Sequence, residues 1–417
     1  MIAEKKTLAS VLLLVCISYI GVALPYPILA PTFLNGEHTA LSTFHQFSPE
    51  VLLGFVLACY PLGMALGGHI MGAMADHFGR KSVLTWSLLG GSVGYVLSGY
   101  ALMTQHYPLL LASRLITGMF EGNISIARSI AADLSPVIPK TTSFSYIHAA
   151  VYVGYLIGPI ISGVLLYFTD AMPFYFAALL NVCGMLLIIK TFNETWKPTQ
   201  KETGLSRFNA WKIFKQPGVL VVCIINLLSA LAFSIFYQFY PLYLVKIYGF
   251  GSDGITLLTV VLTFALIFSS LVVVKLSKRL LSLHNNIILS LMGYLTLALI
   301  MVNADSMAIF VVSFTLLGIF IVTSGTHIGV FVSDLTSVDD QGKLMGILAT
   351  LSASGTVLSI LVGSWLATLS PYYPMMMSII CALASLLIFL SIMRKPYSFQ
   401  HNELPVEPSP GHIDDNN

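Results

Sequence analysis

Long runs of apolar residues, separated by short polar stretches, make up most of the chain. About 20 apolar residues in a helix cross a bilayer core of roughly 30 Å, so each run predicts one membrane-spanning helix. Six runs lie near residues 7–30, 50–71, 82–104, 107–131, 143–168 and 172–192, and six more near 218–245, 253–275, 286–303, 306–333, 343–368 and 372–393. The pattern predicts an all-α polytopic membrane protein with twelve transmembrane helices.

The longest polar stretch divides these runs into two groups of six. It predicts an N-terminal six-helix bundle over residues 1–192, a cytoplasmic linker over 193–217 and a C-terminal six-helix bundle over 218–393. The segment 394–417 is rich in Pro, Glu, Asp and Asn. This composition cannot bury much apolar surface, so we expect a disordered cytoplasmic tail.

Short matches between the two groups share one offset of about 200 residues. Asp133-Leu-Ser matches Asp334-Leu-Thr, Gly118 and Phe120 match Gly318 and Phe320, and Gly163 matches Gly363. Many transporters consist of such internal repeats. The common offset therefore predicts two pseudo-symmetric bundles that arose by duplication.

The positions of Lys and Arg predict the orientation in the membrane. Nearly all basic loop residues fall on one side, and Lys246 is the exception on the other. Cytoplasmic loops carry this excess of positive charge, so both termini are expected in the cytoplasm. Only 9% of the residues are charged and the net charge is +2, whereas soluble domains carry about 25% charged residues. The composition gives no reason to expect a nucleic-acid partner.

One polar turn stands out between the second and third apolar runs. It reads Gly72-Ala-Met-Ala-Asp76-His-Phe-Gly79-Arg80-Lys81. The glycines permit close approach and unusual dihedral angles, and Asp76 is expected near the positive end of a helix dipole. This turn resembles the signature loop of the major facilitator superfamily of secondary transporters. The alternative is a plain solvated turn that carries inside-positive charge.

The resemblance implies a gating role for this turn. In the family, the charge group steadies the outward-facing state and must loosen for the conformational switch. Arg80 would pair with Asp133 at the cytoplasmic end of helix 4, and Asp76 and Lys81 belong to the same charge group.

Helix 4 carries Arg114-Leu-Ile-Thr-Gly118, which resembles the R-x-x-x-G motif of the family. Arg114 and Glu121 lie seven residues apart, so they share one helix face about 10 Å apart along the axis. Charged groups inside a membrane are costly and usually face a cavity or a partner. Glu121 is the candidate proton-binding group, with Arg114 as the residue that sets its proton affinity or holds a polar group of the cargo. The alternative is a structural ion pair that braces helix 4 against helix 1 or 2.

Helix 5 carries Gly154-Tyr-Leu-Ile-Gly158-Pro159-Ile-Ile-Ser162-Gly163. This resembles the antiporter motif G-x-x-x-G-P-x-x-G-G of the family, with Ser162 in place of one glycine. The resemblance favours export by antiport. The alternative is a helix-packing motif, since small residues at this spacing let helices approach closely.

Aromatic and polar residues at helical spacing are candidates for the cargo site. These candidates are Tyr26 in helix 1 and Asn226, Phe233, Tyr237 and Tyr240 in helix 7. Aromatic walls with few polar groups suit an amphipathic cargo. The alternative is a set of ordinary lipid-facing or interfacial aromatic residues.

The sequence lacks the motifs of common enzymes and metal sites. It contains no P-loop, no His and carboxylate pattern with metal spacing and no Gly-x-Ser-x-Gly elbow. We therefore expect no cofactor, no metal and no enzymatic activity.

The resemblance covers about residues 7–395 and is greatest to the twelve-helix drug:proton antiporters, including the tetracycline-exporter-like group. It implies two six-helix bundles that rock around a central cavity lined by helices 1, 4, 7 and 10. The expected function is proton-coupled export of a small amphipathic compound by a monomer in a bacterial inner membrane. The expected partners are the small-molecule substrate, protons and the lipid bilayer.

Two other functions remain open from the sequence. One is a proton symporter or facilitator that imports a nutrient or a metal chelate such as a siderophore. The other is a membrane sensor or scaffold that has kept the fold and no longer transports.

Overall fold

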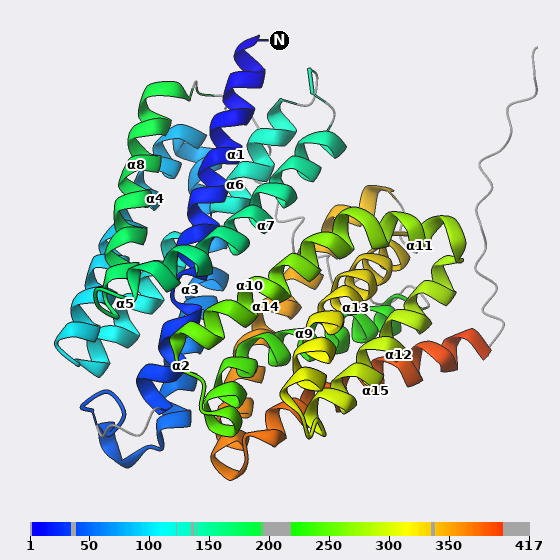
Figure 1. Ribbon diagram of the computed structural model, residues 1–417. Helices are drawn as coiled ribbons and strands as arrows, with labels where there is room; N and C mark the ends of the chain where they lie inside the picture. Colours follow the sequence, from blue (N-terminus) through cyan, green and yellow to red (C-terminus); the bar gives the residue numbers. More distant parts are fainter. Residues whose placement is uncertain are drawn as a thin grey trace, which may run out of the picture.

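The computed structural model describes residues 2–34, 39–121, 123–134, 137–138, 140–192, 194, 218–334 and 338–394. Within these residues the chain is built of helices (Figure 1). Of the predicted linker only Glu194 is described, and of the predicted tail only Arg394, so the rest of both segments lies outside the described residues.

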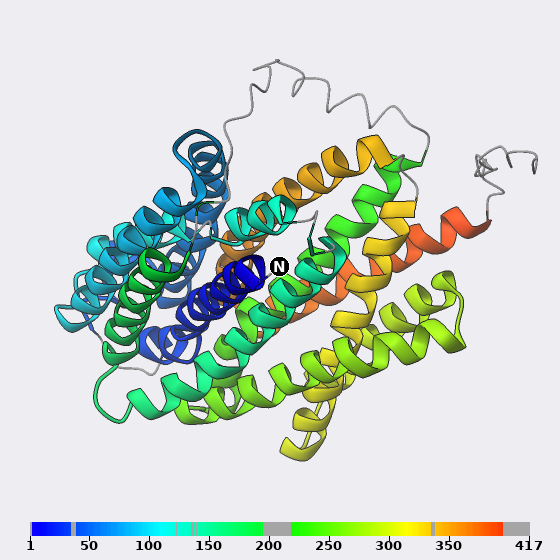
Figure 2. The ribbon, with the colours of Figure 1, turned by 90° about the horizontal axis from the view of Figure 1, so that it is seen from above.

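Two groups of helices lie side by side in Figures 1 and 2. The first comprises α1 (Ile2–Ala23), α2 (Tyr26–Leu34), η1 (Phe44–Gln46), α3 (Pro49–Phe78), α4 (Arg80–Met103), α5 (Tyr107–Phe120), α6 (Asn123–Asp133), α7 (Lys140–Leu165) and α8 (Met172–Thr191). The second comprises α9 (Val219–Tyr248), α10 (Ser252–Phe268), the π-helical turn η3 (Ser269–Val273), α11 (Val274–Leu280), α12 (Leu283–Val302), α13 (Met307–Asp334), α14 (Val338–Leu369) and α15 (Tyr372–Arg394). We call these groups the first and second halves.

Among the described residues, nine helical segments are long and apolar enough to cross a membrane. The helices that fall short of this criterion are α4, α5, α6 and α7. Within α7, the segment Ala149–Leu165 is a shorter apolar helix. The outer surface carries exposed large apolar side chains such as Trp86, Leu257 and Phe264. Exposed apolar surface on this scale indicates contact with lipid. The exact number of twelve spans remains a prediction.

The first predicted span is broken rather than continuous. Proline has no N–H group to donate and disfavours the helical conformation of the residue before it. Pro25 and Pro27 therefore end α1 at Ala23, and α2 starts at Tyr26. The carbonyl of the buried Leu24, at this break, accepts a hydrogen bond from the hydroxyl of Ser162 in α7 (2.8 Å).

The two halves meet through a small set of helices. The contacts between them pair α3 with α14, α7 with α10, and α2 with α9 and α10. We call the end of the molecule at which α1 begins the near face, and the opposite end the far face. Since successive membrane helices alternate in direction, the Gly79 turn lies at the near face, and the start of α3 and the end of α9 lie at the far face.

Candidate functional site

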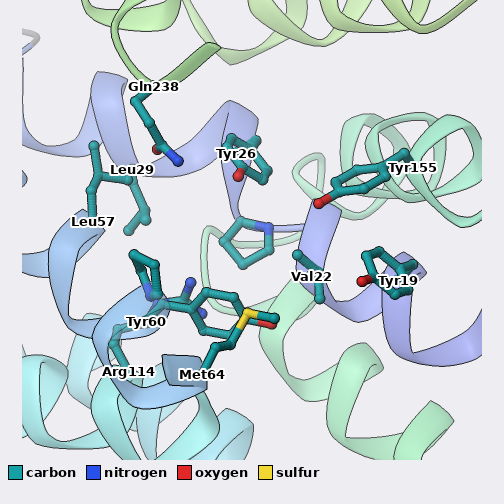
Figure 3. Close-up of a pocket in the computed structure, with 12 residues that line it drawn as sticks. Tyr19, Val22, Tyr26, Leu29, Leu57, Tyr60, Met64, Arg114, Tyr155 and Gln238 are labelled. Atoms are coloured by element: carbon teal, nitrogen blue, oxygen red, sulfur yellow. The ribbon is translucent and has the colours of Figure 1, made fainter. Parts of the chain in front are cut away.

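A cavity of about 180 Å³ lies in the middle of the molecule between α1, α2, α3, α5, α7 and α9 (Figure 3). Tyr19 and Tyr155 lie on one side of it, and Arg114, Tyr60 and Met64 lie on the other (Figure 3). The remaining lining residues are Val22, Pro25, Tyr26, Leu29, Leu57, Pro61 and Gln238. All but Gln238 come from the first half, so this half forms most of the site.

The guanidinium group of Arg114 is the charged group among the described lining residues. Arg114 is only 4% exposed, and its Cζ lies 4.5 Å from the centre of the Tyr60 ring. Such cation–π contacts are stronger where water is excluded. Among the residues that the structure describes, its Nε and Nη1 atoms have no hydrogen-bond partner. Two donors of a buried cation are thus left available for a ligand.

Glu121 occupies an interruption of its helix rather than a continuous helical face. The residue is the C-cap of α5, with its backbone N–H bonded to the Gly118 carbonyl (3.1 Å), and α6 begins only at Asn123. It is 5% exposed. The predicted run 107–131 is therefore interrupted at Glu121. Whether Arg114 and Glu121 act together in proton binding remains a prediction.

Groups from two further helices surround the Glu121 carboxyl. Tyr95 of α4 and Asn181 of α8 make polar side-chain contacts with it, and the charge of Arg114 acts on it. Within the described residues, neither Oε1 of Glu121 nor the hydroxyl of Tyr95 makes a hydrogen bond of ordinary geometry. Gly91 leaves the space for this arrangement, because a Cβ there would lie 2.9 Å from Nδ2 of Asn181 and 4.0 Å from Oε1 of Glu121. The carboxyl is buried, polar in its surroundings and incompletely bonded.

The predicted cargo residues fall into two sets. Tyr26 lines the cavity, and the Tyr237 ring packs against it at a centroid distance of 5.1 Å and against Tyr155 at 6.4 Å. Phe233 instead packs edge-on against Tyr294, and Tyr240 bonds to Thr259 (2.5 Å) inside the second half.

Asn226 is half-buried in α9 and is not among the described lining residues. Tyr26 thus lines the cavity, and Tyr237 packs against two of the lining rings. Asn226, Phe233 and Tyr240 are not among the described lining residues.

The near-face turn is held by two acids. Arg80 Nε lies 3.4 Å from Asp133 Oδ2, which is the pairing the sequence anticipates. The carboxylate of Glu194 accepts hydrogen bonds from the backbone N–H groups of Arg80 and Lys81, both at 3.0 Å. An anion is stabilised at such a helix N-terminus. The acid at the start of α4 is thus Glu194, a residue of the predicted linker 193–217.

The other members of the turn differ from one another. Gly79 adopts a φ of 90°, which only glycine adopts readily. Gly72, in contrast, has open space where a Cβ would lie. Asp76 is in the last turn of α3 rather than at a helix start, and its side chain lies outside the described part of the structure. A role of the turn in gating remains a prediction.

The glycines of α7 make close contacts. A Cβ on Gly154 would lie 2.8 Å from the Cys16 carbonyl oxygen, and one on Gly158 would lie 2.6 Å from the Cβ of Ala23. The helix passes through Pro159 without ending. Gly163 faces Thr256 of the second half. These residues pack α7 against α1 and against α10, and whether they also set the direction of transport remains a prediction.

The far face carries direct contacts between the halves. Lys246 Nζ lies 2.8 Å from Glu50 Oε1. Nearby, a Cβ on Gly54 would lie 1.9 Å from Oγ of Ser364. This ion pair and this close packing join α3 to α9 and α14.

Sequence reasoning missed several residues around the site. Tyr60, Tyr95, Tyr155 and Asn181 come from four helices, and nothing in the sequence shows that they meet. Asn181 offered a signal, because it is the one amide in the apolar run 172–192. No group of three His, Cys, Asp or Glu side chains in the described ranges is placed to hold a metal ion.

Comparisons with known proteins identify the family of the chain. The family model of the Major Facilitator Superfamily matches residues 11–326. A tetracycline resistance protein, class H, of Pasteurella multocida is 30% identical over 195 residues, which are 46% of each chain. Multidrug resistance protein 1 of Bacillus subtilis is 25% identical over 258 residues, 61% of this chain and 63% of its own length. The chain thus spans about half to three-fifths of the length of these curated relatives.

Solved structures share the fold over almost the whole chain. The nucleoside transporter NupG superposes with a TM-score of 0.71 at 14% identity and covers 94% of this chain and 98% of its own. The human organic anion transporter MFSD10 (TETRAN) has a TM-score of 0.66 at 17% identity and covers 93% and 98%. At these identities the likeness shows the fold alone.

Proposed function

Since the chain belongs to the major facilitator superfamily, we propose that it exports a small amphipathic compound in exchange for protons. As a member of this family it is a multi-pass membrane transporter of a small molecule and not an enzyme. We place it in a bacterial inner membrane as a monomer, with both termini and the near face in the cytoplasm. Relatives named for resistance to tetracycline and to multiple drugs support export.

Glu121 is the proton site in this proposal. The observation that carries it is a buried carboxyl at a helix break, on the α5–α6 segment that also presents Arg114 to the cavity. Its Oε1 atom has no hydrogen-bond partner among the described residues. A group in such a position can take up and release a proton during the transport cycle. The titratable groups that face it are Arg114, Tyr19, Tyr60, Tyr95 and Tyr155.

The experiment compares wild type, Glu121→Gln and the control Asp305→Asn in reconstituted vesicles. Asp305 is an exposed carboxyl in the loop between α12 and α13. We expect an imposed pH gradient to drive flux of at least one of a panel of lipophilic cations, neutral aromatic drugs and aromatic carboxylates in wild type and in Asp305→Asn. Glu121→Gln should bind cargo but show no pH-driven flux. Normal coupling in Glu121→Gln would refute the assignment, and no flux from any variant would support a non-transporting sensor.

One observation favours a second candidate, which is co-transport of an acidic nutrient or chelate with protons. The described lining of the cavity contains Arg114 and no carboxylate. An anion beside Glu121 would favour the protonated carboxyl, so the anion and the proton would bind together. Exchange requires the opposite, because bound cargo must expel the proton.

The pH dependence of cargo binding separates the two candidates. In exchange, affinity rises as the pH rises through the titration of Glu121, whereas in co-transport affinity falls over the same range. In both cases Glu121→Gln should remove the dependence.

A further inference from the structure

We propose that the cargo carries an acidic group, a carboxylate or a similar oxyanion, which binds to Arg114 while its apolar body lies among the tyrosines of the cavity. The inference rests on the proposed function only in taking the central cavity as the cargo site. An acidic cargo beside Glu121 would favour co-transport over exchange, because the anion and the proton would bind together.

Arg114 is a buried cation in the wall of the cavity. A buried cation without partners is costly, because its hydration is lost and nothing replaces it. Two of the three guanidinium nitrogens, Nε and Nη1, have no acceptor in the described ranges of the chain. Arginine is the side chain best suited to bind carboxylate and phosphate groups. The unbonded donors therefore form a site that an oxyanion can fill.

The charges near the cavity also favour an anionic cargo. Glu121 is the acid whose charge acts on Arg114, but no ion pair joins the two within the part of the chain that the structure describes, and Glu121 does not line the cavity. No Asp or Glu is among the described lining residues. A cationic cargo would therefore meet a like charge on entering, without a carboxylate in the described lining to compensate.

The rest of the described cavity wall is mostly aromatic and apolar. Tyr60 supports the guanidinium from one face at 4.5 Å. Across the cavity, Tyr19 and Tyr155 pack edge to face with centroids 5.2 Å apart. Tyrosine rings bury apolar surface and carry a hydroxyl group at one edge. Gln238 supplies an uncharged polar group from the second half. This wall fits a compact aromatic or aliphatic body.

The test measures equilibrium binding to the full chain in lipid nanodiscs at constant pH. The probes are matched sets on one ring system: 1-naphthylacetate, its methyl ester and 1-naphthylmethyl-trimethylammonium, with two further ring systems treated alike. We expect the carboxylate of at least one set to bind about tenfold or more tightly than its ester, which is the contribution of a charge-assisted hydrogen bond. The ammonium probe should bind most weakly.

Variants assign the preference to one side chain. Arg114→Gln should bring the carboxylate and the ester within about twofold of each other. Arg128→Gln is the matched control, because Arg128 is an exposed arginine of α6 outside the cavity, and it should keep the wild-type preference. Arg114→Lys keeps the charge but loses the planar donors, so it should keep a reduced preference. This variant serves as the test if Arg114→Gln does not give a monodisperse protein.

Two outcomes would overturn the inference. One is that no carboxylate binds more tightly than its own ester and ammonium analogues. The other is that the preference persists in Arg114→Gln. The vesicle experiment on Glu121 is separate: a preference that depends on Arg114 without pH-driven flux refutes the proposed function alone. Flux of esters or cations without carboxylates refutes the inference alone.

Discussion

The two halves of the molecule share a framework but differ in the chemistry that they bury. The ring of Phe120 lies 2.4 Å from where Gly90 of α4 would carry a Cβ, and the ring of Phe320 lies 2.4 Å from the same point on Gly293 of α12. The offset of about 200 residues in the sequence is therefore an equivalence of packing as well. It lets positions of α4 and α5 be compared with partners in α12 and α13.

At this offset the two membrane charges have apolar partners. Arg114 corresponds to Phe314, which stacks on Phe310 with ring centroids 5.7 Å apart inside the core of the second half. Glu121 corresponds to Ile321, and α13 runs unbroken from Met307 to Asp334 through that position. The helix is interrupted only in the copy that carries the acid. The fold needs neither the charges nor the break, and this supports a functional reason for both.

The largest expected difference between the halves comes from an equivalent pair of glycines. A Cβ on Gly118 would meet backbone, 2.2 Å from the Tyr60 carbonyl oxygen, whereas one on Gly318 would meet the end of the Leu262 side chain at 2.9 Å. Gly118→Ala should lower the free energy of unfolding by about 2–3 kcal/mol and Gly318→Ala by less than about 1 kcal/mol. Thermal unfolding in detergent measures both, and equal losses would contradict the comparison.

The next effect concerns the hydrogen bond that holds the broken first helix. Ser162→Ala removes the donor to the Leu24 carbonyl and should cost about 1–2 kcal/mol, because the carbonyl is left without a partner. The control is Ser359→Ala in α14, whose hydroxyl bonds to the carbonyl of Thr356 in its own helix. We expect the control to lose less than half as much in the same unfolding experiment. If Ser359→Ala lost as much free energy of unfolding as Ser162→Ala, the bond to Leu24 would have no special role at the break.

A smaller effect separates the caps of two equivalent helices. The start of α4 is capped by Glu194, far along the chain, whereas α12 is capped by its own Ser282, which accepts from the N–H of Asn285 (3.4 Å). Glu194→Ala should cost about 1 kcal/mol and Ser282→Ala somewhat less. Amide hydrogen exchange of the first turns of α4 and α12 reads each cap separately. Added salt should weaken the Glu194 cap alone, and a salt effect on Ser282 would argue against this explanation.

The smallest effect is expected where the halves meet at the far face. Lys246 and Glu50 are 35% and 11% exposed at their side chains, so their ion pair contributes about 0.5–1 kcal/mol. We call the form in which α3 and α9 meet at the far face the closed form, and the form in which they separate the open form. Glu50→Gln should shift the ratio of these two forms by a few-fold. Distances between spin labels on the two halves would report this shift. The charge swap Glu50→Lys with Lys246→Glu should restore the closed form, and failure to do so would exclude a direct ion-pair effect.

The apolar pattern of the chain was enough to predict the helical membrane architecture, because each span must satisfy its own backbone hydrogen bonds and must be apolar enough for lipid. Charged residues inside apolar runs are rare for the same reason, so Arg114 and Glu121 were visible without a structure. The Arg80 and Asp133 pairing followed from the signature turn. Local chemistry of this kind is encoded within a few residues of chain.

Which side chains meet depends on the packing of helices that lie far apart in the sequence. Tyr60, Tyr155 and Gln238 reach one cavity from three helices, and Glu194 caps a helix that begins 114 residues earlier in the chain. Tyr237 packs against the cavity-lining Tyr26, whereas Tyr240, one helical turn later, bonds to Thr259. Helical spacing fixes which residues share a face, but the packing of neighbouring helices decides what that face meets.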